Sequence, residues 1–260
     1  MYLRAIHTES HIPTLQNLIS TNPLGLLTTA IKSPLYPLLQ TSHIPLVLDI
    51  PAPSDSDPTP PGTLRGHIAK QNPQAKALIE ALTTQDPSNS THELADEVLV
   101  LFNGAHNHYV TPKFYTETKP ATGKVVPTWN YAAVQAYGKI RVYWDSRDEE
   151  TGTFLQKQVE DLTRLCEGGI MGFTGEEGRK KPWGVEEAPV SYVEILKRNI
   201  VGIEIRIERL QGKFKMNQEM GNGDREGVVE GFEGLGSEVG LGMAGMVRER
   251  GELKDREKKV

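Results

Sequence analysis

Residues 66–74, GHIAKQNPQ, combine residue types that can bind an anion. They predict the end of a strand, a polar turn and the start of a helix. Backbone N–H groups at a helix start attract negative charge, and Lys70, Asn72 and Gln74 add side-chain donors. The segment therefore predicts a phosphate-binding turn, with a capped and solvated turn as the alternative.

Further charged residues lie on predicted strands. Arg65 and His67 share one face of the strand that leads into this turn. Neither side chain should be buried without a partner, so this face is expected to contact water or a ligand. Lys213 and Lys215 are in phase on a later strand, where they either meet a phosphate or an acidic partner or remain solvated.

His106 and His108 flank Asn107 in a segment predicted to be a loop. A His-x-His pair can bind a metal ion, but no third ligand is evident nearby, so no metal site is predicted. The sequence contains no GxSxG, HExxH or P-loop motif and no GxGxxG after a strand. Catalytic residues are therefore not identified.

Residues 124–144, KVVPTWNYAAVQAYGKIRVYW, predict one long strand because they are rich in β-branched and aromatic residues. Side chains alternate between the two faces of a strand. The even positions are small and apolar except for Thr128 and Asn130, which need hydrogen-bond partners if buried. Those partners can be backbone, a second subunit or a ligand; the alternative is a polar strand end at the sheet edge.

The odd positions of this strand mix aromatic rings with polar groups, a composition typical of an interface or a ligand wall. They include Trp129, Tyr131, Tyr137 and Tyr143. These four rings would form a sizeable exposed patch on a monomer. The pattern predicts a homodimer.

Composition sets broad bounds. The chain has 260 residues, 37% hydrophobic content and a net charge of -5, so it can bury a core and is not expected to bind nucleic acid directly. The single cysteine, Cys166, suits a reducing compartment. No secretory signal or membrane span is predicted. We expect a cytoplasmic protein, with the nucleus as the alternative.

Hydrophobic periodicity predicts a mainly β, α+β protein or a decorated β-barrel. Helices are expected at residues 11–20, from 73 onward, at 145–166 and at 189–199; strands are expected at 24–30, 43–49, 63–69, 97–103, 124–144 and 200–208. The apolar phase shifts after residue 208, which predicts a bulge or turn near 209–212.

Three segments are expected outside this core. Residues 51–61 and 168–182 predict mobile inserts. Residues 233–260 are rich in glycine and charge and predict a disordered tail that is dispensable for the core. The predicted domain is therefore 1–232.

Several segments, in order, resemble the PaiB-type FMN-binding negative transcriptional regulators. They are NPLGLLTT (22–29), SHIPLVLD (42–49), LRGHIAKQNPQ (64–74), HYVTPKFY (108–115), GKVVPTWNYAAVQAYGKIRV (123–142), IVGIEIRIERLQGKFKMNQ (200–218) and DREGVVEGF (224–232). The chain departs from the family in a longer segment around Ala105 and in its inserts and tail, which are expected of a fungal member.

This resemblance implies an FMN-binding split β-barrel with peripheral helices, similar to FMN-dependent pyridoxamine oxidases and flavin reductases. It also implies a homodimer with flavin at the subunit interface and the flavin phosphate at the turn after residue 69. The residues expected to contact the cofactor are Arg65, His67, Lys70, Asn72, Gln74, Thr128, Trp129, Asn130, Tyr131 and Lys213.

Three functions agree with this sequence. The first is an FMN-binding protein, with FMN-dependent oxidoreductase activity as its enzymatic form. The second is a transcriptional regulator or ligand sensor without turnover. The third is a haem-binding or haem-degrading protein with His67, His106 or His108 as the axial ligand.

Overall fold

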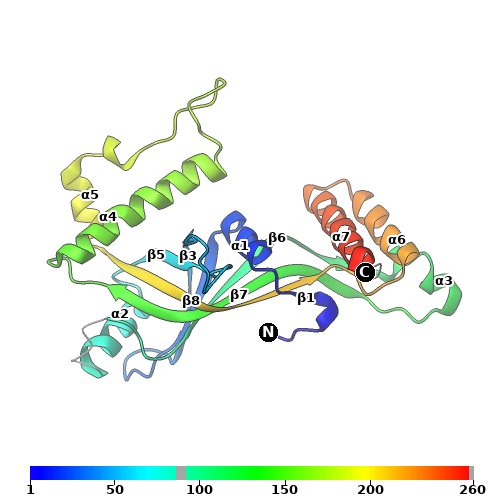
Figure 1. Ribbon diagram of the computed structural model, residues 1–260, viewed down its shortest axis with the longest axis horizontal. Helices are drawn as coiled ribbons and strands as arrows, with labels where there is room; N and C mark the ends of the chain where they lie inside the picture. Colours follow the sequence, from blue (N-terminus) through cyan, green and yellow to red (C-terminus); the bar gives the residue numbers. More distant parts are fainter. Residues whose placement is uncertain (86–91, 258–260) are drawn as a thin grey trace. The chain divides into compact units, whose positions relative to one another are not determined.

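The computed structural model describes residues 1–85 and 92–257 and is mainly β with peripheral helices (Figure 1). The strands are β1 (Thr8–Glu9), β2 (Leu24–Ala30), β3 (Leu39–Pro45), β4 (Val47–Asp49), β5 (Thr63–Ala69), β6 (Val98–Val110), β7 (Thr128–Tyr143) and β8 (Ile200–Lys215). The helices are α1 (Ile12–Thr21), α2 (Pro73–Glu80), α3 (Thr118–Thr122), α4 (Glu149–Arg164), α5 (Val190–Lys197), α6 (Asn222–Glu233) and α7 (Glu238–Glu257). The predicted α+β, mainly β class is confirmed.

The strands follow the order β3-β2-β6-β7-β8-β5-β4, with β1 added beside β8. The pairs β2–β3, β2–β6, β4–β5, β5–β8 and β1–β8 are antiparallel. Within the described residues, β3 and β4 end this path, so the sheet is open. No helix in the same part of the chain is long and apolar enough to cross a membrane.

The chain forms two compact units, which we describe one at a time. Unit 1 contains Met1–Leu18, Asn103–Gln135 and Gln211–Val260, and unit 2 contains Ile19–Phe102 and Ala136–Leu210. The long strands β6, β7 and β8 each contribute residues to both units.

In unit 2, α4 packs against β5 (Figure 1). The ring of Phe154 on α4 stacks on Tyr143 of β7 with centroids 3.9 Å apart. Gly202 of β8 leaves room for this ring, since a Cβ there would lie 2.6 Å from Phe154. Gly138 likewise allows β7 and β8 to lie close together, because a Cβ added there would lie 2.0 Å from the Arg206 carbonyl oxygen.

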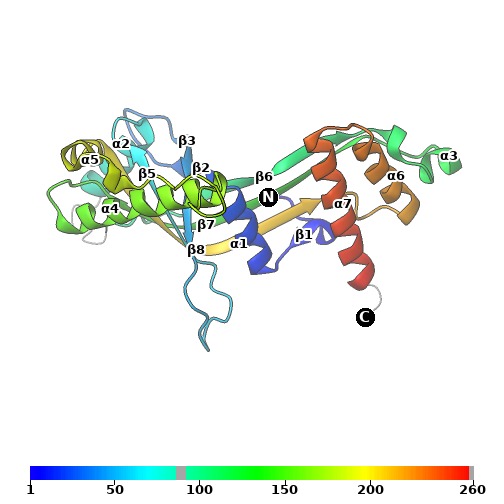
Figure 2. The same ribbon diagram turned by 90° about the horizontal axis from the view of Figure 1, so that it is seen from above.

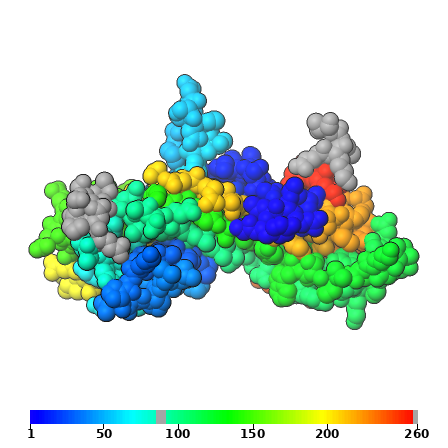
Figure 3. Space-filling view, turned by 90° about the horizontal axis from the view of Figure 1, so that it is seen from below, coloured from blue at the N-terminus to red at the C-terminus, as the bar shows by residue number. Residues whose placement is uncertain are grey.

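The predicted inserts of unit 2 contain little regular structure. Residues 51–61 form neither helix nor strand and project from the surface as the light-blue segment in Figure 3. A π-helical turn, Leu165–Ile170, overlaps the start of the second insert, and 171–182 is irregular. The mobility of both inserts stays a prediction.

In unit 1, α6 and α7 lie side by side (Figure 2). The prediction of a disordered tail is wrong for Glu238–Glu257, which form α7. Met243, Ala244 and Val247 share one face of this helix and are buried. Glycine and charged residues separate these few apolar positions in the sequence, so the helical pattern is weak. Residues 258–260 of the predicted tail lie outside the described residues.

Strand β6 is longer than predicted, and His106 and His108 lie in it rather than in a loop. Both side chains meet the C-terminal helices. The His108 ring contacts Phe232 edge to face at 5.5 Å, and a Cβ on Gly242 of α7 would lie 2.4 Å from His106. Because α6 and α7 pack against His106 and His108, these polar residues are accommodated within β6, where the sequence suggests a loop.

Alternation correctly assigned the even face of β7 and the phase shift in β8. It was wrong for Tyr143, one of the four rings predicted on the exposed odd face, which is 5% exposed and stacks on Phe154. Every even position of β7 from Asn130 to Val142 is buried, and Trp129 on the odd face is 53% exposed. In β8 the buried positions change from odd to even across Glu208 and Arg209, which are both exposed. The strand nevertheless continues to Lys215 instead of ending in a turn.

The odd face of β7 is partly exposed in the folded chain, so homodimerisation stays a prediction. Trp129 and Tyr109, with ring centroids 6.4 Å apart, are both exposed in unit 1. We expect light scattering at micromolar concentration to give twice the chain mass, because burying such rings contributes strongly to association. A monomer under these conditions would contradict the prediction.

Candidate functional site

The turn between β5 and α2 is held by Asn72, which is the N-cap of α2. Its Oδ1 accepts a hydrogen bond from the Gln74 backbone N–H at 2.9 Å, and its Nδ2 donates to Ser42 Oγ on β3 at 3.0 Å. Pro73 follows at the first helical position, where it needs no N–H partner. Asn72 therefore fixes the helix start and ties it to the sheet.

Replacing Asn72 with alanine should lower the free energy of unfolding by about 1 kcal/mol, the usual loss when an N-cap is removed. Urea denaturation would measure the change. Gln71→Ala is the matched control, because Gln71 is the exposed neighbour and caps nothing. Equal stability of the two variants would show that the cap contributes little.

Gln74 is buried, with 1% of its surface exposed. Its Nε2 lies 3.1 Å from the Leu27 carbonyl oxygen, 3.0 Å from Thr29 Oγ1 and 3.2 Å from the Gln40 carbonyl oxygen. These contacts connect α2 to β2 and β3. The amide nitrogen predicted to contact phosphate is thus engaged by the protein, and a phosphate contact of Gln74 stays a prediction.

The Lys70 ammonium is less engaged by the protein than the Gln74 amide. The side chain is half-buried, and in the part of the chain that the structure describes its Nζ makes a single long hydrogen bond, 3.4 Å to the Trp144 carbonyl oxygen. Lys70 lines an open hollow of about 510 Å³ with Lys76 and Glu80. The hollow extends from Lys70 along α2 to Thr84, beyond the end of the helix, and its two lysines and one glutamate leave it with net positive charge that favours an anion.

Arg65 is buried in an ionic network rather than facing solvent. Its guanidinium donates to both carboxylate oxygens of Asp49, to Gln158 at 3.2 Å and to Asp161 at 2.8 Å. Hydrogen bonds to Asp49, opposed by burial and reinforced by Asp161, raise the pKa of Arg65. This network connects β5 to β4 and α4.

His67 is half-buried on the same strand, and its Nδ1 is buried without a hydrogen-bond partner among the described residues. Burial lowers the pKa of His67, so the imidazole is neutral at pH 7. A neutral imidazole with an unused nitrogen can accept a proton or bind a metal-centred cofactor.

Asn130 of β7 is completely buried in unit 1. Its Nδ2 donates to Asn217 Oδ1 at 2.6 Å, and Asn217 Nδ2 donates to Tyr115 Oη at 3.3 Å. The Asn130 Oδ1 has no hydrogen-bond partner in the described part of the chain. The chain of three side chains joins separate segments of unit 1, so Asn130 has a structural role whether or not it contacts a ligand.

The remaining predicted residues of unit 1 lie beside two lysines. Lys215 donates to Thr128 Oγ1 and, at 3.1 Å, to the Trp129 carbonyl oxygen. Lys213 Nζ lies 5.4 Å from the centre of the Tyr131 ring. Lys215 was not among the predicted cofactor contacts, although its phase with Lys213 was a usable signal in the sequence.

The ten predicted residues thus divide between the units. Unit 2 brings together Arg65, His67, Lys70, Asn72 and Gln74 on β5 and the start of α2; unit 1 brings together Thr128, Trp129, Asn130, Tyr131 and Lys213 on β7 and β8. Each group contains a half-buried lysine. The assignment of these residues to a cofactor stays a prediction.

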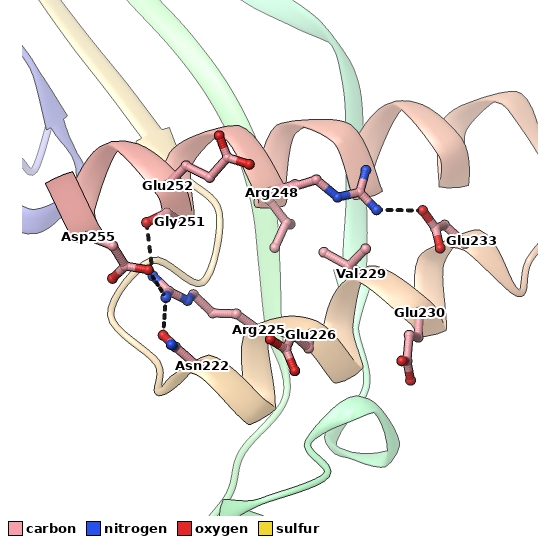
Figure 4. A pocket seen from close by; sticks show the side chains of 11 residues that line it. Asn222, Arg225, Glu226, Val229, Glu230, Glu233, Arg248, Gly251, Glu252 and Asp255 are labelled. Atoms are coloured by element: carbon pink, nitrogen blue, oxygen red, sulfur yellow. Dashed lines mark hydrogen bonds and ion pairs between the residues drawn. The ribbon is translucent and has the colours of Figure 1, made fainter.

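A groove of about 470 Å³ lies between α6 and α7 (Figure 4). Its cations are neutralised inside the groove. Arg225 binds Asn222, Asp255 and the Gly251 carbonyl oxygen, and Arg248 binds Glu233 at 2.7 Å (Figure 4). Because additional acidic residues line it, this groove does not suit an anion. Across residues 1–85 and 92–257, no group of three or more His, Cys, Asp or Glu residues could hold a metal ion.

The fold and these residues define an α+β protein with a mainly antiparallel sheet and cationic sites on its strands. The chain belongs to the family described as "Putative FMN-binding domain", whose model matches residues 1–209. The predicted resemblance is therefore confirmed.

Relatives agree with this membership. An uncharacterized protein of Aspergillus fumigatus is 69% identical over 98% of this chain and all of its own length. Protease synthase and sporulation protein PAI 2 of Bacillus subtilis is 29% identical over 64% of this chain and 63% of its own. A solved FAD- and haem-binding protein from Mycobacterium smegmatis has 11% identity and a TM-score of 0.44, covering 80% of this chain and 73% of that one; likeness at this level carries no argument about ligands.

Proposed function

We propose that this protein binds FMN and that the bound flavin supplies redox chemistry. The observation that carries the proposal is the match of residues 1–209 to an FMN-binding family. In this proposal the chain binds and orients the cofactor, and no residue is assigned to proton transfer.

The turn after β5 fits the phosphate of FMN mainly through charge. Lys70 has unused donor directions and precedes the positive end of the α2 dipole, and Lys76 lies in the same hollow. The first-turn N–H of Gln74 is already capped by Asn72, so a ring of free N–H groups is not part of the proposal. A charge-assisted hydrogen bond from Lys70 would be the strongest single contact.

An absorbance spectrum of the purified protein tests the proposal. We expect the blue-region bands of bound flavin, or their appearance in a protein-bound form when FMN is added to the apo protein. Bleaching by a reduced nicotinamide would support an oxidoreductase over a regulator or sensor without turnover. Failure to bind FMN at any accessible concentration would overturn the proposal.

Haem binding is the second candidate function, because the neutral His67 has a buried nitrogen without a partner in the described residues. His106 is less suited, since α7 packs against it at Gly242. A Soret band that is present in the wild type and absent in His67→Ala would favour this function over flavin binding.

A further inference from the structure

Three cations, Arg4, Lys213 and Lys215, lie near one another in unit 1, where Lys213 and Arg4 act electrostatically on Lys215. Lys213 and Lys215 point to one face of β8, and both are half-buried. Neither lysine nor Arg4 forms an ion pair within residues 1–85 and 92–257. The chain as a whole carries a net charge of -5, so this concentration of positive charge runs against its composition.

The N-terminal segment brings Arg4 to these lysines. Strand β1 pairs with β8 so that Thr8 lies opposite Lys213. The Lys213 Nζ donates to the Tyr2 carbonyl oxygen at 3.1 Å, which holds the chain on the other side of Arg4. Burial is the main cause that lowers the pKa of Lys215. Glu219 opposes it, and the positive charges of Lys213 and Arg4 lower the pKa further by smaller amounts.

One carboxylate, Glu219, acts electrostatically on Lys215 but forms no ion pair with it among the described residues. Glu219 raises the pKa of Lys215, and its Oε2 also bonds to His7 Nε2 at 3.0 Å. His7 is buried, so this pair is fixed in the structure. Three positive charges therefore share a region in which one acid is already engaged.

Aromatic rings and hydrogen-bond acceptors surround the two lysines. The rings of Tyr131 and Tyr2 lie 5.4 and 5.7 Å from the Lys213 ammonium. Lys215 is held by Thr128 and the Trp129 carbonyl oxygen, which leaves one ammonium N–H for a further acceptor. A bound anion would offset the mutual repulsion of the cations and accept this donor.

We propose that Arg4, Lys213 and Lys215 form a binding site for the phosphate or carboxylate group of a small molecule. The group would be supplied either by FMN itself or by a second anionic metabolite. The site does not depend on the assignment of the FMN phosphate to the turn after β5, because it uses none of the residues of that turn.

Thermal unfolding in inorganic phosphate tests the site directly. We expect the Tm of the wild type to rise by about 2–4 °C at phosphate concentrations well above Kd, because a ligand stabilises the state that binds it. Lys215→Gln should lose most of this rise. Only the phosphate-dependent rise within each variant is compared, because Lys215→Gln also removes the bonds to Thr128 and Trp129 and so changes the Tm without phosphate.

Lys139→Gln is the matched control, because Lys139 is a half-buried lysine of β7 that bonds to the Ala95 carbonyl oxygen, away from this cluster in the sequence. General stabilisation by excluded phosphate should be equal in all variants, so only differences between variants count. An equal rise in wild type, Lys215→Gln and Lys139→Gln would overturn the proposal. If Lys215→Gln does not fold, Lys213→Gln and Arg4→Gln replace it, and a full rise in both would be equally decisive against the site.

Flavin titrations then distinguish the two sources of the anion. If FMN occupies the site, Lys215→Gln should weaken FMN binding about tenfold or more and leave riboflavin binding unchanged. If a separate metabolite occupies it, FMN affinity should be the same in Lys215→Gln and wild type while the phosphate-dependent Tm rise is still lost. Both results support an anion site; failure of FMN to bind at all would reject the FMN proposal alone.

Discussion

Replacing Arg65 with methionine is expected to lower the free energy of unfolding by about 3 kcal/mol, the largest effect on stability that we predict for the strand residues singled out from the sequence. Methionine keeps much of the side-chain volume but removes every hydrogen bond to Asp49, Gln158 and Asp161. The loss is large because Arg65 is buried and Asp161 is only 15% exposed, so their charges are poorly solvated once separated.

Urea denaturation of the purified variant would measure this loss. Arg147→Met is the control: Arg147 is 90% exposed and pairs with Asp145 at the surface, where an ion pair contributes little. If both variants unfold at the same urea concentration, the Arg65 network does not stabilise the fold and our interpretation of it is wrong.

The pH dependence of stability gives this prediction a second readout. Burial would raise the pKa of Asp161, but hydrogen bonds from Lys157, Arg65 and Arg164 outweigh it and lower the pKa to about 2. Because the folded-state pKa is below the unfolded value of about 3.9, the stabilisation is present above that value and is lost as the pH falls toward about 2. Arg65→Met should therefore show a smaller loss of stability on acidification than the wild type.

Replacing Lys70 with alanine is expected to weaken FMN binding about ten- to hundredfold, from the loss of one charged phosphate contact worth ~1.5–3 kcal/mol. The fold should be unaffected, because the Lys70 ammonium makes only one long hydrogen bond within the described residues. Fluorescence titration of the apo protein with FMN would measure the affinity. Riboflavin, which has no phosphate, should bind both proteins equally.

Two further lysine variants serve as comparisons for Lys70→Ala. Lys76→Ala removes a second positive charge from the same hollow and should have a smaller effect. Lys213→Ala removes the cation from β8 and tests the other group of predicted residues. Unchanged FMN affinity in Lys70→Ala would place the phosphate elsewhere, and an effect confined to Lys213→Ala would place it on unit 1; neither outcome would alter the fold or the family.

The sequence by itself was sufficient for the class of fold and for the faces of the long strands. Alternation identified the buried side of β7 and the phase shift in β8, because burial of one sheet face imposes a period of two on neighbouring residues. The family was also accessible from sequence, since its ordered segments lie along the chain and need no three-dimensional information.

Only the tertiary structure decided what the polar residues contact. Arg65 binds acids 16 and 96 residues away, and Gln74 bonds to two strands that precede it; neither distance has a signature in local sequence. The same reason explains α7, whose few apolar residues become a core only when α6 packs beside them. Periodicity reports whether a side chain faces a core or solvent, whereas the identity of its partner depends on contacts between segments far apart in the chain.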